Sequence, residues 1–213
     1  VKASAKINAS NPCGEFVFVD DSACNLSSIN LLKFLDDENN FNIADYAQTI
    51  KIMTIAQEII VDRAKYPTKS IEDNSHKYRP LGLGYSNLGA LLMSLEYPYD
   101  SDISRSYASA ITSLMTGFAY ATSAEIASIK SPFTDFQKNK EVMLKVLKQH
   151  KEMNSKIDFS LIPDKIKNKT EEVWAQGIEL GNKYGFRNAM VTLLAPTGTS
   201  SFMMDCDTTG IEP

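Results

Sequence analysis

The sequence contains few residues that form disulfides or bind metals: three cysteines and two histidines among 213 residues. A small, odd number of cysteines does not support a disulfide-stapled scaffold and is typical of a reducing compartment. No Cys-x-x-Cys pair is present, so a zinc site would need ligands from distant segments. We therefore predict no metal site, and we expect each cysteine to be either catalytic or buried.

Long apolar runs and an excess of positive charge are also absent. No run approaches the roughly 18 residues that a membrane span needs, and residues 1–6 lack the hydrophobic region of a signal peptide. The net charge of -4 offers no basic surface for duplex nucleic acid, although a nucleotide needs only a local anion site. We predict a cytoplasmic globular protein without membrane or nucleic-acid partners. Because the chain does not begin with methionine, we expect it to be a piece of a longer protein.

The organisation of the chain indicates a single domain over residues 1–213, since it has no internal repeat, low-complexity stretch or linker. Apolar residues at spacings of three and four predict four helices, over residues 42–66, 100–129, 137–153 and 163–184. Asn42 and the run Asp100-Ser101-Asp102 are suitable N-caps for the first two. Residues 15–21 and 188–194 are predicted strands. The order of strand, helices and strand indicates the α/β class and fits a piece of an α/β barrel.

The helix predicted at 137–153 has two different faces. Its apolar residues lie on one side, and five lysines lie on the other: Lys138, Lys140, Lys145, Lys148 and Lys151. Such a face usually points to solvent, so we predict a solvated surface rather than an anion-binding site.

An amide, a thiol and a carboxyl occur at alternate positions near the start of the chain, as Asn11, Cys13 and Glu15. In an extended backbone these side chains would share one face and lie within roughly 7 Å of one another, at about 3.3 Å per residue. That arrangement suits a site with a hydrogen-bonding amide, a reactive sulfur and a proton acceptor. A turn with an incidental cysteine is the alternative, because Asn-Pro and Cys-Gly are common loop dipeptides.

A second candidate site follows the strand predicted at 188–194. Small and hydroxyl residues leave backbone N–H groups and side-chain donors available there: Thr197, Gly198, Thr199, Ser200 and Ser201. If a helix begins at this point, its N-terminus also favours an anion, so we predict a phosphate-binding loop. A simple helix cap is the alternative. The loop lacks the Gly-Lys-Ser/Thr ending of a Walker motif.

The glycines of Leu81-Gly82-Leu83-Gly84 could indicate a dinucleotide-binding loop. The third glycine and a suitably placed acidic residue are missing, however. We therefore interpret Gly82 and Gly84 as positions of close packing beside a barrel.

Four stretches in the right order resemble the large catalytic subunit of ribonucleotide reductases. The first stretch is Asn11–Glu15 together with Cys24-Asn25-Leu26, which begins eleven positions after Cys13. The other three are residues 78–85, residues 195–201 and residues 204–213. The residues around Cys24 and the Asp-Cys-Asp-Thr-Thr-Gly-Ile-Glu-Pro ending are most similar to those of the adenosylcobalamin-dependent class. The resemblance implies part of a ten-stranded α/β barrel, helix-rich in this segment, whose Asn-x-Cys-x-Glu tip lies on a finger loop through the barrel centre.

The resemblance also implies the roles of the site residues. Cys13 would form a transient thiyl radical that takes the 3'-hydrogen of a ribonucleotide, and Glu15 would accept the 3'-hydroxyl proton. Asn11 would hold the substrate hydroxyls. Cys24 would be one of two thiols that supply the reducing equivalents and end as a disulfide, with its partner in a segment before the first motif. We expect Cys206 to be buried and without a redox role.

The same resemblance implies reduction of ribonucleotides to 2'-deoxyribonucleotides for DNA synthesis. Among the substrates, we favour diphosphates over triphosphates. The cofactor would be adenosylcobalamin, for which no binding residues are identified. The expected partners are the remaining segments of the reductase, a thioredoxin-like reductant, dNTP and ATP effectors, and a second copy in a homodimer.

Three alternatives remain open. The chain could belong to the class that receives its radical from a separate iron or manganese subunit. It could be a catalytically incomplete domain or one half of a split protein, which folds and binds nucleotide without turnover. It could also be a thiol–disulfide exchanger that links Cys13 to Cys24.

Overall fold

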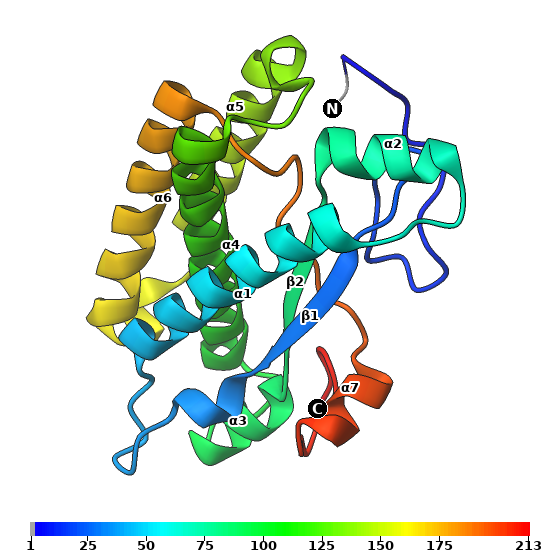
Figure 1. Cartoon of the computed structure of the whole chain (residues 1–213). Coiled ribbons are helices and arrows are strands. Elements are labelled where there is room, and N and C mark those ends of the chain that lie inside the picture. The colour runs from blue at the N-terminus through cyan, green and yellow to red at the C-terminus, as the bar shows by residue number, and fades with distance from the viewer. Residues whose placement is uncertain (1–2) are drawn as a thin grey trace.

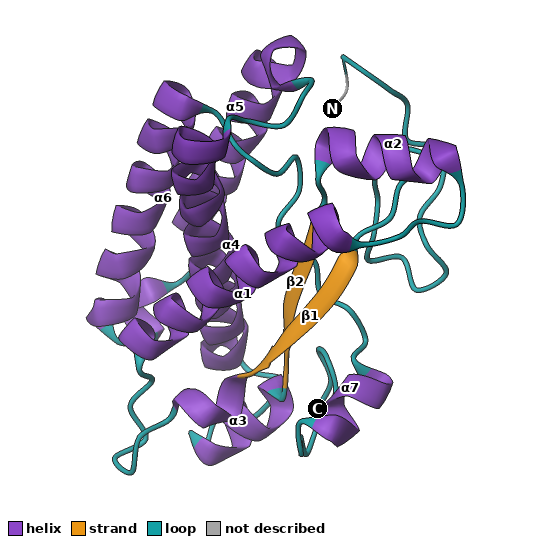
Figure 2. Ribbon diagram, viewed as in Figure 1, coloured by secondary structure: helices purple, strands orange, loops and turns teal. Residues whose placement is uncertain are grey.

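The structure, a computed structural model, describes residues 3–213 and is rich in helix (Figures 1 and 2). The elements follow in this order: β1 (Asn25–Asn30), η1 (Leu31–Phe34), α1 (Ile43–Arg63), α2 (Lys69–Tyr78), β2 (Leu81–Ser86), α3 (Leu88–Ser94), α4 (Asp102–Lys130), α5 (Phe136–Met153), η2 (Asn154–Lys156), η3 (Phe159–Leu161), α6 (Asp164–Tyr184) and α7 (Gly198–Met203). Among the described residues, no helix is long and apolar enough to cross a membrane.

The sheet consists of β1 and β2, which run parallel with Asn25 opposite Leu81. On the other side of β2, the extended segment 190–193 adds further parallel hydrogen bonds. Leu83 N donates to Val191 O at 3.1 Å, and Leu193 N donates to Leu83 O at 3.0 Å. All six residues of β2 are buried, as is typical of a strand covered on both faces. Three parallel chain segments therefore end on the same side of the molecule.

The glycines of β2 allow its neighbours to come close. A Cβ atom on Gly84 would lie 2.5 Å from the carbonyl oxygen of Leu193, and one on Gly82 would lie 2.7 Å from Leu26 Cδ2. The predicted close-packing role of these glycines is confirmed.

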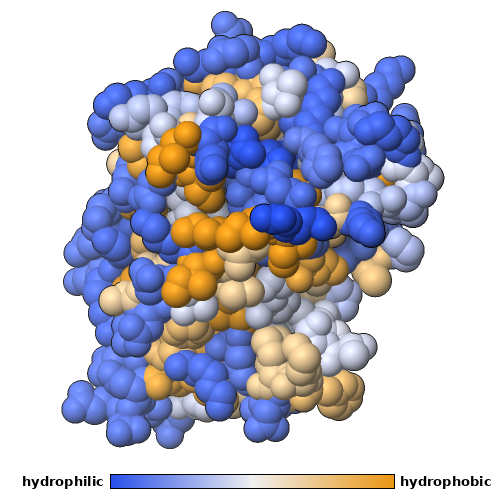
Figure 3. All heavy atoms as spheres, in the orientation of Figure 1, coloured by the Kyte–Doolittle hydropathy of each residue, from blue (hydrophilic) through white to orange (hydrophobic). Residues whose placement is uncertain are grey.

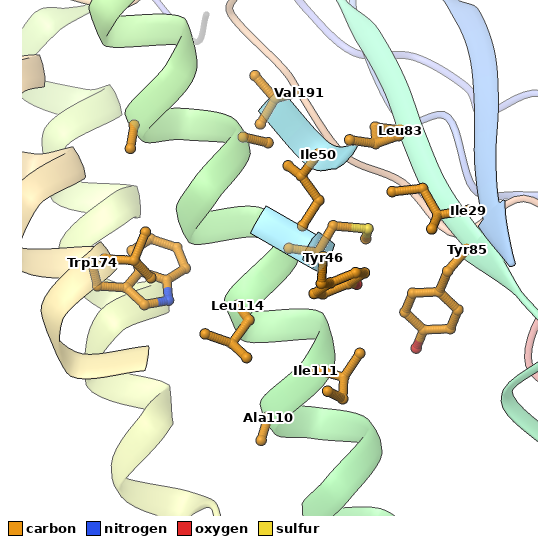
Figure 4. Close-up of a cluster of buried hydrophobic side chains, with 14 of the residues drawn as sticks. Ile29, Tyr46, Ile50, Leu83, Tyr85, Ala110, Ile111, Leu114, Trp174 and Val191 are labelled. Atoms are coloured by element: carbon orange, nitrogen blue, oxygen red, sulfur yellow. The ribbon is translucent and has the colours of Figure 1, made fainter. Parts of the chain in front are cut away.

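The long helices cover the sheet, with α4 packed against both α1 and α6 (Figure 1). Figure 4 shows how buried side chains from β1, β2, α1, α4, α6 and the segment 190–193 meet in one core: Ile29, Tyr46, Ile50, Leu83, Tyr85, Ala110, Ile111, Leu114, Trp174 and Val191. Apolar side chains also remain exposed on α1, namely Ile52, Ile55, Ile59 and Ile60, and Figure 3 shows hydrophobic atoms gathered over this helix.

The predicted helix boundaries agree closely with the structure. Asn42 Oδ1 accepts from Asp45 N at 3.1 Å, and Ser101 Oγ accepts from Ser104 N at 3.3 Å, so both are N-caps. Gly185, at φ +80°, ends α6 in the left-handed region that favours glycine. Helices α2 and α3 were not predicted.

The predicted strand at 15–21 is wrong. Within that segment the structure contains only an isolated antiparallel bridge, between Val17 and Ser10. Phe18 and Val19 are instead buried against the core without strand partners. The predicted strand at 188–194 pairs with β2 through 190–193, but only as an isolated bridge and individual hydrogen bonds. The described chain contains a two-stranded parallel sheet, and the ten strands of the barrel of which the resemblance makes it a part stay a prediction.

A buried polar cluster connects α1, the start of β2 and the segment before 190–193. The Glu58 carboxylate accepts from Arg79 Nε at 2.6 Å, from Arg187 Nε at 2.6 Å and from Asn188 Nδ2 at 2.7 Å. Ser123 on α4 donates to Asn188 Oδ1 at 2.8 Å. The buried carboxylate is thus paired and fully hydrogen-bonded, which such a charge requires in a protein interior.

Candidate active site

The first motif folds as a tight turn rather than as an extended strand. Gly14 N donates to Asn11 O at 3.0 Å, and Asn11 N donates to Phe16 O at 3.2 Å. Gly14 has φ +85°, a conformation that glycine adopts without strain. The expectation that Asn11, Cys13 and Glu15 share one face of an extended chain is therefore wrong. The turn instead leaves the Cys13 thiol exposed at its tip.

Asn11 is engaged within the turn itself. Its Oδ1 accepts from Phe16 N at 3.0 Å. The residue lines a hollow of about 320 Å³ with Phe16, Phe18 and residues 19–22, and it is not among the residues that surround Cys13. The structure places Asn11 beside the candidate site, and its role in holding substrate hydroxyls stays a prediction.

Cys13 and Glu15 line a cavity of about 310 Å³ together with the second predicted motif. The remaining lining residues come from β1, from the chain before α7 and from the first turn of α7: Leu26, Ser27, Ser28, Ala195, Pro196, Thr197, Gly198, Thr199 and Ser200. The two motifs are about 180 positions apart in sequence. The second motif follows the segment 190–193 at the end where β1 and β2 also end, a usual place for ligand sites, and the turn that precedes β1 brings the first motif to it.

Glu15 lines the cavity with Cys13, and its charge acts on the Cys24 thiol, which is not among the lining residues. Its Oε2 atom is buried and has no hydrogen-bond partner among the described residues. Cys24, directly before β1, is half-buried. Burial raises the pKa of the Cys24 thiol to about 11, and the negative charge of Glu15 adds to this, against a backbone hydrogen bond at Cys24 that lowers it. Cys24 is therefore a protonated thiol at neutral pH, and Glu15 offers an unoccupied acceptor.

The second motif forms the start of α7. Residues Gly198, Thr199 and Ser200 occupy the first turn and are exposed, whereas Thr197 and Ser201 are buried. Thr197 has φ +59°, which is unusual for a β-branched residue. Four of the five predicted phosphate-binding residues line the cavity, and Ser201 lies beneath it.

The buried hydroxyl groups under this loop form a cluster that includes Ser86 at the end of β2. Thr197 Oγ1 donates to Ser86 Oγ at 3.0 Å, and the Ser86 and Ser201 hydroxyl oxygens lie 2.6 Å apart. Ser86 Oγ also donates to Thr208 O at 3.1 Å, and Gly210 N donates to Thr197 Oγ1 at 2.7 Å. We call these residues, Ser86, Thr197, Ser201, Thr208 and Gly210, the hydroxyl cluster. It joins β2, the loop and the ending at 204–213.

Asn87 holds the same ending from the other side. Its Oδ1 accepts from Asp207 N and from Thr208 N, both at 3.0 Å. Its Nδ2 donates to Asn30 Oδ1 at 3.0 Å, at the end of β1. Sequence reasoning missed both Ser86 and Asn87. Their position at the carboxyl end of a buried parallel strand was the available signal.

Ser27 and Ser28 of β1 were also missed as lining residues. They follow Cys24 in a segment whose polar residues did not indicate a strand. Cys206, which was expected to be buried, is half-buried; its N–H donates to Ser201 O at 3.0 Å, and it is not among the cavity-lining residues. Within residues 3–213, no group of three or more histidine, cysteine or acidic side chains is placed to hold a metal ion.

Comparison with known proteins agrees with this geometry. The family described as "Ribonucleotide reductase, barrel domain" matches residues 1–213. Proteins named "Vitamin B12-dependent ribonucleotide reductase" from Rhodopirellula baltica, Agrobacterium fabrum and Streptomyces coelicolor are 51%, 44% and 42% identical to this chain, each over 99% of it. These matches cover 20%, 18% and 22% of the relatives, so the chain spans about a fifth of their length.

The family description also accounts for the parallel β segments and their covering helices, which are part of an α/β barrel domain. The chain belongs to the ribonucleotide reductase barrel-domain family.

Proposed function

We propose that this chain forms part of the active site of an adenosylcobalamin-dependent ribonucleotide reductase, which converts ribonucleotides to 2'-deoxyribonucleotides for DNA synthesis. The observation that carries the proposal is the single cavity lined by Cys13, Glu15 and residues 196–200. The cavity combines a cysteine and a carboxylate with a free buried oxygen, which can act on the sugar, with a hydroxyl-rich loop, which can bind the phosphates. The names of the similar proteins support the same activity and cofactor.

Cys13 and Glu15 act on the 3' position of the sugar. Cys13, as a thiyl radical, takes the 3'-hydrogen atom, and the Glu15 carboxylate accepts the proton of the 3'-hydroxyl. The unpartnered Oε2 of Glu15 supports this role, because a buried carboxylate oxygen without a donor is available to a substrate hydroxyl. The radical at C3' makes loss of the protonated 2'-hydroxyl as water easy.

Cys24 supplies one of the two reducing equivalents. Two thiols give two hydrogen equivalents to the substrate and become a disulfide, so that one ribonucleotide and two thiols yield one deoxyribonucleotide, one water and one disulfide. The raised pKa of Cys24 keeps its hydrogen on sulfur at neutral pH, where it is available for transfer. Its partner thiol lies in another segment of the enzyme, since Cys13 must stay free to carry the radical.

Residues 197–200 bind the substrate phosphates. Gly198, Thr199 and Ser200 are exposed on the cavity, and their backbone N–H groups occupy the first turn of α7 without intrahelical partners. Ser201 acts beneath them through the hydroxyl cluster. We favour diphosphates over triphosphates, which turnover measurements on both substrates would compare.

The exposure of Cys13 at the cavity fits adenosylcobalamin as the radical source, because the sulfur would be open to a radical generated by a group held by other parts of the protein. When bound, the cofactor supplies the radical through homolysis of its cobalt–carbon bond. No other described residue is assigned to it.

The complete protein adds the parts that this segment does not provide. We propose that the remaining chain completes a ten-stranded barrel by pairing with β1 and covering the exposed isoleucines of α1. A thioredoxin-like reductant, dNTP and ATP effectors, a homodimer, a cytoplasmic location and a single domain over residues 1–213 stay predictions.

The test compares cysteine variants of the full-length enzyme supplied with adenosylcobalamin and a dithiol. Cys13→Ser should abolish both product formation and release of tritium from 3'-labelled substrate, because a serine oxygen radical is far harder to form. Cys24→Ser should retain tritium release but stop multiple turnover. Cys206→Ser is the matched control and should stay active.

Turnover by Cys13→Ser would refute the thiyl role. Activity that needs a separate metal-containing subunit instead of adenosylcobalamin would assign the chain to the other class. Tight nucleotide binding by the complete wild-type protein, with no product under either condition, would indicate a protein that does not turn over. Oxidation that links Cys13 to Cys24, found by peptide mapping, would favour the disulfide exchanger.

A further inference from the structure

A second cavity lies on the helical side of the molecule, between α4, α5 and α6. It has a volume of about 370 Å³, within the range of about 300–1,000 Å³ typical of small-ligand sites. Its lining residues are Ser109, Thr112, Ser113, Thr116, His150, Met153, Asn154, Lys156, Ile157 and Trp174. None of them belongs to the candidate active site.

Two aromatic rings border this cavity: His150 is exposed, whereas Trp174 is only 3% exposed. Their centroids lie 6.3 Å apart at an interplanar angle of 89°, and Met153 and Ile157 complete the apolar wall. A flat ring in the cavity has the exposed His150 ring to stack on and reaches only a small part of the Trp174 surface. The shape suits a planar ligand.

The walls of the cavity are held in place by hydrogen bonds. Trp174 Nε1 donates to Ser113 Oγ at 2.8 Å, and Ser113 Oγ donates to Asn154 Oδ1 at 2.6 Å, so α6, α4 and η2 are joined at the cavity. Figure 4 shows the Trp174 side chain extending from α6 toward α4. On the other side, Thr112 and Thr116 form hydroxyl contacts with Tyr85 and Thr192, at 2.8 and 3.1 Å. The cavity is thus preformed.

The charges around the cavity are mainly positive. Lys156 lines it, and an adjoining cavity of about 830 Å³ shares Asn154 and Ile157 with it. The charged residues of that neighbour are Lys148, Lys151, Lys167, Glu152 and Glu171. Four lysines therefore face two glutamates, and within the described chain none of the six forms an ion pair within 4.0 Å. Lys148 and Lys151 were predicted to lie on a solvated surface, and both are exposed. At this position their positive charges attract an anion.

We propose that this cavity binds a small aromatic anion, with its flat ring on His150 beside the exposed part of Trp174 and its carboxylate or phosphate directed toward Lys156 and the adjoining lysines. The ring accounts for the apolar wall, and the anion accounts for the unpaired lysines beside it. The proposal does not depend on the proposed reductase activity.

Trp174 is the only tryptophan among residues 1–213, so in the full-length protein a change in emission that the substitution Trp174→Phe abolishes is assigned to this cavity. Phenyl phosphate is the probe, and three compounds separate its parts: benzyl alcohol lacks the anion, cyclohexyl phosphate lacks the flat ring, and inorganic phosphate lacks both ring and apolar body. We expect a saturable change in Trp174 emission with phenyl phosphate at millimolar concentration or below. The three partial compounds should bind more weakly, and ligand-observed NMR with the same compounds provides a second measurement.

Two lysine variants test the direction of the anion. Lys156→Gln should weaken phenyl phosphate binding about three- to fivefold, as expected for loss of one exposed charge contact, and should leave benzyl alcohol binding unchanged. Lys145→Gln, also on α5 but outside both cavities, is the matched control and should bind like the parent chain. Absence of saturable binding by both methods would overturn the proposal, and so would equal affinity for cyclohexyl phosphate or an unchanged affinity in Lys156→Gln.

Discussion

Removal of one buried hydroxyl group should show how strongly the candidate phosphate loop is held. Ser86 is completely buried, and its Oγ accepts from Thr197 Oγ1, lies 2.6 Å from Ser201 Oγ and donates to Thr208 O. The substitution Ser86→Ala removes these three contacts while changing the volume of the side chain very little. Its effect should therefore come from hydrogen bonding rather than from a cavity.

The magnitude follows from the partners that remain. Thr197 Oγ1 still accepts from Gly210 N at 2.7 Å and still lies 2.9 Å from Ser201 Oγ, and Thr208 O still accepts from Asn87 N at 3.2 Å. No group is left completely unpaired, so the full desolvation penalty does not apply. Three lost contacts, each in the lower half of the range of about 0.5–1.5 kcal/mol, give a loss of about 2 kcal/mol.

Urea unfolding followed by Trp174 fluorescence measures this loss. With a slope of about 2 kcal/mol per molar urea, the midpoint should fall by about 1 M without a change in slope. Ser128→Ala is the control, because the Ser128 hydroxyl is exposed and bonds only to Glu125 O within α4; it should change stability by less than about 0.5 kcal/mol. A Ser86→Ala midpoint within error of the parent would refute the reasoning, since the hydroxyl cluster would then contribute nothing to stability.

Two further predictions concern the site and its supporting strand. Because burial and the Glu15 carboxylate raise the pKa of Cys24 to about 11, iodoacetamide at pH 8 should modify Cys24 far more slowly than exposed Cys13, and Glu15→Gln should speed the modification. Peptide mass spectrometry measures both rates, and an unchanged Cys24 rate in Glu15→Gln would contradict the placement of that carboxylate. Gly84→Ala, whose Cβ would lie 2.5 Å from a carbonyl oxygen, should cost about 1–3 kcal/mol in urea unfolding. Gly198→Ala, with open space around its Cβ, should cost less, and equal losses would contradict the packing argument.

The helices could be predicted from the sequence because their signals are local. Asn42, Ser101 and Gly185 lie at the ends of long apolar repeats, and each acts at its own helix terminus. The strands could not be predicted as well, because a strand exists only if a neighbour pairs with it. Residues 15–21 have suitable side chains but form only one isolated bridge within the described chain, whereas the polar residues of β1 pair with β2 along six positions.

The same distinction applies to the candidate site. Cys13, Glu15 and residues 197–200 could be found because each motif is continuous in sequence and its residue types suit one chemistry. The residues that support them could not, since Ser86 and Ser201 are 115 positions apart and meet only in the folded chain. The turn at Asn11 was misjudged because its alternating residues fit a strand as well as they fit a turn closed by its own amide.

The strained backbone at Thr197 explains why the buried hydroxyl cluster is needed. A β-branched residue at φ +59° is disfavoured by about 1–2 kcal/mol, so this conformation persists only where other contacts impose it. The Thr197 hydroxyl forms such contacts with Ser86, Ser201 and Gly210. They fix the direction in which the chain enters α7, and the exposed N–H groups of residues 198–200 then point to the cavity that also contains Cys13. Strain at Thr197 and the buried hydroxyls beneath it are therefore two parts of one arrangement, which fixes the conformation of the loop that we propose binds phosphate.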